Sequence, residues 1–141
     1  MKQSKKCEEF FDENYCYSDA EAVEELGLDS ELIDQLLEDY VVQIIKSSTL
    51  FQEYLKNLKH LKKEHNGELD FTEFRELVHK NLGVARNLRI KDSEQILKEL
   101  MKHESLDEIE VYLGILEACA IKLKPKSAYE ALSRVKKSKS E

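Results

Sequence analysis

The sequence contains little proline and glycine, with one proline and four glycines in 141 residues. β-Sandwiches and β-barrels need many tight turns, which these two residues form most readily, so an all-β fold is excluded. Apolar residues make up 41% of the chain and charged residues 36%. That apolar content is too high for a disordered chain and is enough, at this length, to bury one core. We therefore expect one helical domain.

The chain also lacks paired cysteines and long apolar runs. Its three cysteines, Cys7, Cys16 and Cys119, form no CxxC motif, so neither a disulfide framework nor a zinc site is indicated. Cys119 lies in an apolar stretch and is expected to be a small buried side chain. No apolar run approaches the roughly 18 residues that span a bilayer. The basic first residues are followed by acidic ones and not by an apolar segment, which argues against a secretory signal. We expect a cytoplasmic protein with no membrane partner and no bound metal.

Positive charge is in deficit, because the net charge is −7, and this argues against nucleic acid as a partner. The charge is uneven: residues 1–40 hold thirteen acidic and three basic side chains, whereas residues 120–141 hold two acidic and seven basic ones. The last six residues are too few and too polar for a membrane anchor. We divide the chain into an N-terminal extension (1–17), a helical domain (18–135) and a basic flexible tail (136–141).

Helical periodicity fills most of that domain, because apolar residues recur in steps of three and four. The polar run 46–49 marks a bend or a break between two helices. The pattern predicts an all-α fold, an antiparallel four-helix bundle with a short N-terminal helix and an extra terminal helical segment. Helix starts are predicted at Ser18 with Glu21, at Asp29 or Ser30, at Asp70 with Glu73, at Asp92, at Ser105 with Glu108 and at Pro125, and stops at Gly27 and Asn66-Gly67. In the longest stretch the expected buried positions include Leu32, Ile33, Tyr40, Ile44, Leu50, Phe51, Leu55, Leu58 and Leu61.

One histidine lies at the margin of an apolar helical stripe. At 100° per residue, His79 is roughly 100° from Val78, the middle of that stripe, and is expected to be partly exposed in mid-helix. Arg75 and Arg86 share its flank, and Gly83, one turn on, leaves open space where a partner's backbone could approach. Imidazole is a nucleophile near neutral pH, and guanidinium groups neutralise phosphate, so the group suits phosphate chemistry. An ordinary surface histidine flanked by arginines is the alternative interpretation.

The segment 79–88, His-Lys-Asn-Leu-Gly-Val-Ala-Arg-Asn-Leu, resembles the motif of histidine phosphotransfer (HPt) domains. In that family H-x-L-K-G-[SA]-A follows an amphipathic lead-in. The match includes His79, Gly83, Ala85 and the trailing Asn-Leu pair. The lead-in 74–78 and the upstream stretch 25–37 are also similar to the family, and the resemblance covers roughly residues 18–123.

The resemblance implies a phosphorelay intermediate. The Nε2 atom of His79 would accept a phosphoryl group from the aspartyl phosphate of a response-regulator receiver domain and pass it to another receiver. The expected partners are a receiver domain, a hybrid sensor kinase, or both. The receiver would supply Mg²⁺, so this chain needs no cofactor of its own and acts as a monomeric phosphocarrier more than as a conventional enzyme.

The sequence departs from the family beside the histidine. The family usually has lysine three residues after the histidine, beside the phosphoryl group, where this chain has Leu82, and the leucine at the second position is Asn81. Lys80 keeps a positive charge nearby but points around the helix. Either Arg75 or Arg86 then supplies the missing charge, or the domain transfers poorly. Restoring lysine at position 82 is expected to raise the transfer rate.

Two other functions stay open. One is a degenerate HPt-like bundle that docks receiver domains without phosphotransfer, which the departure at Leu82 favours. The other, calcium binding, rests on residues 62–73, which place Gly67, Asp70 and Glu73 as in half of an EF-hand loop. Lys62 occupies the first position of that loop, where an oxygen ligand is required, and no second loop is present in the sequence.

Overall fold

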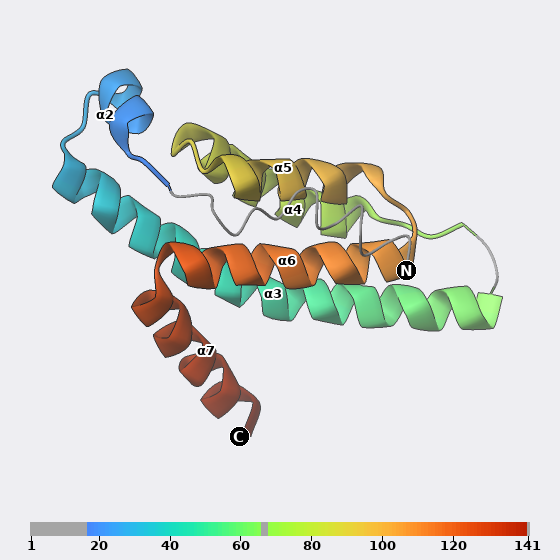
Figure 1. Cartoon of the computed structure of the whole chain (residues 1–141). Helices are drawn as coiled ribbons and strands as arrows, with labels where there is room; N and C mark the ends of the chain where they lie inside the picture. The colour runs from blue at the N-terminus through green and yellow to red at the C-terminus, as the bar shows by residue number, and fades with distance from the viewer. Residues whose placement is uncertain (1–16, 66–67, 141) are drawn as a thin grey trace.

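The computed structural model describes residues 17–65 and 68–140, and every regular element in those ranges is a helix (Figure 1). The helices are α2 (Ala20–Leu26), α3 (Ser30–His65), α4 (Thr72–Asn87), α5 (Lys91–Lys102), α6 (Leu106–Leu123) and α7 (Pro125–Ser140). The prediction of an all-α chain is therefore confirmed. Nearly all of the predicted N-terminal extension, with Cys7 and Cys16, and the predicted stop at Asn66-Gly67 lie outside the described residues.

Several helix limits follow from local signals, as predicted. Gly27 ends α2 with φ at 67°, a left-handed conformation that glycine adopts without strain. The Leu32 N–H donates to Asp29 Oδ1 at 2.8 Å, and the Glu108 N–H donates to Ser105 Oγ at 3.4 Å, so both side chains cap helix starts. Pro125 is the first residue of α7, where its missing N–H has no consequence.

Other predicted limits are wrong by one or two residues. The N-cap of α2 is Asp19 and not Ser18, and the N-cap of α4 is Phe71, although Asp70 Oδ1 accepts the Thr72 N–H at 2.9 Å. Asp92 lies inside the first turn of α5, which begins at Lys91. The chain reverses at Arg89, whose φ is 60°, and this reversal sets the start of α5 earlier than the carboxylate does.

Helix α3 is continuous through the polar run 46–49, so the predicted bend or break is wrong as a break. The reason is tertiary. Ser47 is buried, and its Oγ accepts a hydrogen bond from Asn81 Nδ2 of α4 at 3.1 Å and another from Gln43 Nε2 at 3.3 Å. The serine is therefore used as an interhelical polar contact, and the helix hydrogen bonds continue past it.

Four helices pack in cyclic order: α3 contacts α4, α4 contacts α5, α5 contacts α6, and α6 contacts α3. We call these four elements the helix ring. Helix α7 packs on α3 and α6 outside the ring, and α2 packs on the start of α3 (Figure 1). The core inside the ring contains fully buried apolar side chains from all four members: Ile33, Ile44, Phe51, Phe74, Val78, Ile96, Leu97, Ile109 and Leu116.

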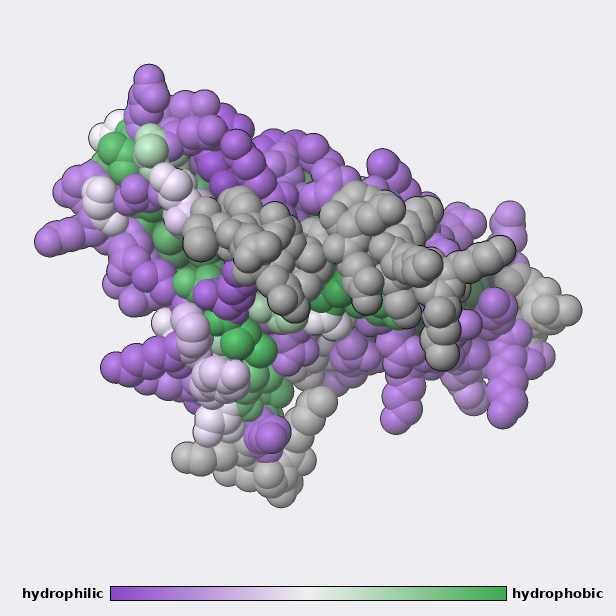
Figure 2. Space-filling model, viewed as in Figure 1, coloured by the Kyte–Doolittle hydropathy of each residue, from purple (hydrophilic) through white to green (hydrophobic). Residues whose placement is uncertain are grey.

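The surface differs from the sequence prediction at a few positions. Leu32, Leu50 and Leu61 were expected in the core and are 44–45% exposed. The apolar stripe of α3 is wider than the part of its surface that the neighbouring helices cover. The face seen in Figure 2 is mostly hydrophilic, with apolar residues visible near α2 and beside α7. Helix α7 continues through residues 136–140, so the tail boundary expected after residue 135 does not coincide with a helix end. No helix within residues 17–65 and 68–140 is both long and apolar enough to cross a bilayer.

Candidate functional site around His79

His79 lies in the middle of α4 and is exposed, as the sequence predicted. The side of α4 that faces the core consists of Phe74, Val78, Asn81, Leu82 and Ala85, all of them buried. This packing fixes the rotation of the helix, so the imidazole is held at the surface by its neighbours and not by contacts of its own. Lys80 is also exposed, one position further around the helix.

Space beside His79 is open at Gly83, one helical turn further on. A Cβ atom added to Gly83 would meet no heavy atom within 4 Å, so the glycine is not required for packing inside the chain. Mid-helix glycine costs stability relative to alanine by about 0.5–1 kcal/mol. A position that carries this cost without an internal contact suits the close approach of another molecule, as the sequence analysis expected.

The two arginines on the flank of His79 are both engaged with carboxylates. Arg75 Nη2 lies 3.5 Å from Glu104 Oε1, and its guanidinium carbon is 5.1 Å from the centroid of the Phe71 ring. Arg86 Nε lies 3.3 Å from Glu94 Oε1. The arginine side chains are 35% and 49% exposed, so neither ion pair is sequestered from water. Sequence reasoning missed both acidic partners.

Leu82 is 6% exposed and belongs to the core. Its expected place beside a phosphoryl group is therefore wrong, because a side chain that faces the ring interior cannot neighbour a group on the surface. Asn81 is also buried: its Nδ2 donates to Ser47 Oγ at 3.1 Å and to the Leu77 carbonyl at 3.0 Å. Both positions that depart from the HPt motif thus contribute to interhelical packing.

The ion pairs also fix how α4 and α5 are aligned. Arg86 meets Glu94 near the turn that joins the helices, and Arg75 meets Glu104 at the other end. In this antiparallel register His79 is level with the segment of α5 around residues 100–101. Lys98 and Lys102 lie on either side of that level, paired with Glu94 at 3.4 Å and with Glu99 at 3.7 Å. The segment of α5 at this level therefore carries two lysine side chains, each paired with a glutamate of its own helix.

The calcium alternative receives no geometric support from the residues described. Residues 62–65, which would begin the loop, belong to helix α3, and Asp70 is used to bind the Thr72 N–H. Bonds from Thr72 lower the pKa of the Asp70 carboxyl below its usual value. Within the described ranges, no three His, Cys, Asp or Glu side chains form a group that could hold a metal ion.

Millimolar Ca²⁺ is expected to leave the melting temperature of the protein nearly unchanged. A ligand that binds only the folded state must stabilise it by RT ln(1+[L]/Kd), and Lys62 puts a positive charge where the first ligand belongs. Differential scanning fluorimetry with Ca²⁺, and with Mg²⁺ as the matched ion, measures the shift. A rise of several degrees with Ca²⁺ alone would revive the EF-hand interpretation.

Comparisons with protein-family models, with curated proteins and with solved structures find no match to this chain.

Proposed function

We propose that this protein is a phosphorelay intermediate in which His79 carries the phosphoryl group. The proposal includes that the helix ring is a four-helix bundle of the HPt type and that the chain works as a monomer in the cytoplasm. Its partners would be a response-regulator receiver domain, a hybrid sensor kinase, or both. The receiver would bring Mg²⁺, and this chain would contribute a positioned nucleophile and a docking face.

The observation that carries the proposal is the placement of His79 in the helix ring. An exposed imidazole in mid-helix, with open space at Gly83 one turn away, lets a partner's active site reach the ring nitrogen without any change in the core. The motif resemblance and the cyclic packing of α3 to α6 agree with that placement.

The transfer step needs little from this chain. The lone pair of His79 Nε2 attacks phosphorus, the bond between phosphorus and the aspartyl oxygen breaks, and the receiver carboxylate leaves while Nδ1 keeps its proton. Charge on the moving phosphoryl group must be neutralised. Arg75 and Arg86 lie on the flank of His79, and each can exchange its carboxylate partner, the exposed Glu104 or the half-buried Glu94, for phosphate oxygens.

The experiment that tests the function is incubation of the protein with a panel of receiver domains carrying labelled aspartyl phosphate. The expected product is an acid-labile, base-stable label on this chain, which is the stability of phosphohistidine. Absence of label with every receiver, together with absence of receiver binding, would overturn the proposal.

Arg86→Ala is expected to slow phosphoryl transfer about tenfold. Lost charge stabilisation costs several kcal/mol at a closed catalytic site, but this site is open, so the low end of about 1–2 kcal/mol applies. Glu94→Gln removes the carboxylate that now holds Arg86 and should speed acceptance. A single-turnover time course from a phosphorylated receiver measures both rates. Lys80→Ala is the matched control, because it removes an exposed charge that points around the helix; an equal loss in this control would reject a specific role for Arg86.

A second candidate is a docking module that binds receiver domains without accepting phosphate. It is favoured by the ion pairs that already occupy both arginines and by the burial of Leu82, where the family has its lysine. Receiver binding by wild-type protein without any transfer of label would select this candidate.

A further inference from the structure

Residues 17–26, which we call the strap, lie across one end of the helix ring. The strap consists of the segment before α2 and α2 itself, which Figure 1 shows at one end of the molecule. Few of its side chains are buried: Ala22 is inaccessible to solvent, Val23 is half-buried, and Leu26 is 41% exposed. Gly27, with open space around its Cα, connects the strap to α3. Apolar packing alone therefore holds the strap weakly.

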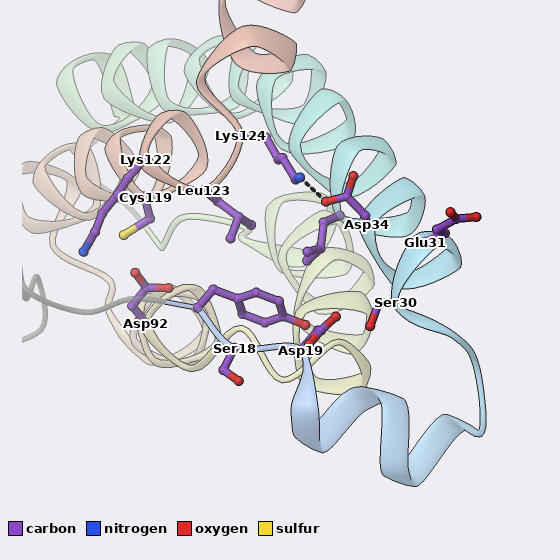
Figure 3. A pocket seen from close by; sticks show the side chains of 12 residues that line it. Ser18, Asp19, Ser30, Glu31, Asp34, Asp92, Cys119, Lys122, Leu123 and Lys124 are labelled. Carbon is purple, nitrogen blue, oxygen red and sulfur yellow. Dashed lines mark hydrogen bonds and ion pairs between the residues drawn. The ribbon is translucent and has the colours of Figure 1, made fainter.

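The space between the strap and the helix ring is only partly filled by side chains. A pocket of about 860 Å³ lies there, lined on one side by residues 17–19 of the strap and on the others by the start of α3, by Asp92 and by the end of α6 (Figure 3). The ion pair between Lys124 and Asp34 in Figure 3 belongs to the wall that the strap does not form. Close packing would have filled this space, so the strap is attached by contacts at its edges.

Those contacts are polar and lead to the turn between α4 and α5. They join the Tyr17 hydroxyl to the Leu88 carbonyl at 2.5 Å, the Glu25 carboxylate to the Arg89 guanidinium, and Glu21 Oε1 to Lys91 Nζ at 3.1 Å. The four side chains of the two ion pairs are 34–62% exposed. Exposed ion pairs add little stability each and are screened by salt. The strap is therefore held by bonds that can break without disturbing the core.

Arg89 stands at a backbone position that favours glycine. Its φ is 60°, and the N–H groups of Arg89 and Ile90 donate back to the Arg86 and Ala85 carbonyls at 3.2 and 3.0 Å. This is the pattern of helix ends in which the left-handed residue is usually glycine, because other residues are strained there. The ion pair with Glu25 accounts for the arginine, since glycine would end α4 equally well but could not bind the strap.

We propose that the strap is an electrostatically controlled conformational device, which opens as a unit about Gly27 while the helix ring stays folded. Its closed state depends on the two ion pairs to the α4–α5 turn, and so on salt and on the charge of Glu21 and Glu25. A partner or a modification that neutralises either carboxylate shifts the strap toward the open state. Opening exposes Ala22 and Val23 to solvent.

Hydrogen exchange of the intact chain at about 50 mM and about 1 M NaCl tests the proposal, because the higher concentration screens exposed ion pairs. The reporters are the amides of Val23 and Gly27, which donate to the Asp19 and Val23 carbonyls at 2.8 and 3.0 Å. We expect protection at low salt that is weaker than in the middle of α6 and that falls about two- to fivefold at high salt. Protection as strong as in α6, no protection at low salt, or no response to salt would overturn the proposal.

Glu25→Gln removes a carboxylate from the last turn of α2, where negative charge is unfavourable for a helix. The helix itself would gain from this change, so an exchange rate that rises about two- to fivefold would report the lost pair with Arg89. Glu24→Gln is the matched control, because Glu24 is exposed on the same turn and has no ion-pair partner within residues 17–65 and 68–140. It should not speed exchange, and equal effects of the two variants would reject the ion pair as the attachment.

Arg89→Gly separates the attachment of the strap from the stability of the ring. Glycine adopts the left-handed conformation without strain, so the urea midpoint of the whole fold should stay the same or rise. The α2 amides should nevertheless lose protection about two- to fivefold, and combining this change with Glu25→Gln should add nothing, because both remove one pair. Unchanged α2 protection, additive losses in the double variant, or a lower urea midpoint would each count against a strap that opens independently of the ring.

Discussion

His79→Gln is expected to abolish phosphoryl labelling while leaving the fold intact. Glutamine has similar polarity and reach, but its amide nitrogen has no lone pair available for attack on phosphorus. His79 is exposed and makes no contribution to the core, so the free energy of unfolding should change by no more than about 0.5 kcal/mol. Label transfer from a phosphorylated receiver, far-UV circular dichroism and urea unfolding measure the three quantities.

His60→Gln is the matched control for this variant, because His60 is also an exposed histidine on a helix, with its Nε2 atom 3.7 Å from Glu64. Label should persist in His60→Gln at the wild-type level. Persistence of label in His79→Gln would place the phosphoacceptor elsewhere. Loss of label in both variants would show that the assay reports on the fold and not on the nucleophile.

Leu82→Lys is expected to destabilise the protein by about 2–4 kcal/mol. It is not expected to raise the transfer rate, contrary to the expectation drawn from the motif alone. The leucine is 6% exposed, so the variant loses apolar burial and leaves an ammonium group inside the helix ring unless the chain opens around it. Urea unfolding measures the change. Transfer in this variant should fall or stay the same, since the new charge does not begin at the surface beside His79.

Val84→Lys provides the control on the same helix, because Val84 is 39% exposed and lysine is at least as good a helix former as valine. Its unfolding free energy should stay within about 0.5 kcal/mol of wild type. If Leu82→Lys were as stable as Val84→Lys and transferred phosphate faster, the lysine stem would reach the surface, and the motif-based expectation would be correct after all.

Local chemistry explains which parts of the fold the sequence predicts. Gly27, Asp29, Ser105 and Pro125 act on the backbone within a few residues of themselves, so their effects are visible without tertiary structure. The burial of Leu82 can be predicted from the sequence in the same way. Four residues after Val78 it lies about 40° from the centre of the buried stripe, and that angle alone places it in the core.

The remaining features depend on contacts between segments far apart in the chain. The sequence around Ser47 does not predict that its hydroxyl accepts a hydrogen bond from Asn81, 34 positions away. This bond gives the polar side chain a partner in the core, so α3 need not break there. Glu94 and Glu104 form ion pairs with the arginines of α4 only because α5 runs antiparallel to α4. The pocket lined by residues 17–19, 30–37, 92 and 119–124 is less predictable still, since its lining comes from four separate parts of the chain.

The continuity of α3 has a consequence for how the molecule opens. At 36 residues and about 1.5 Å per residue it is about 54 Å long, and its turns are covered by α2, α4, α6 and α7. Amide hydrogens in the covered central turns, around Tyr40 to Leu58, can exchange with solvent only when the fold as a whole unfolds. The exposed last turns, from Lys59 onward, can fray on their own. Hydrogen exchange would therefore divide one unbroken helix into a globally protected segment and a locally opening end.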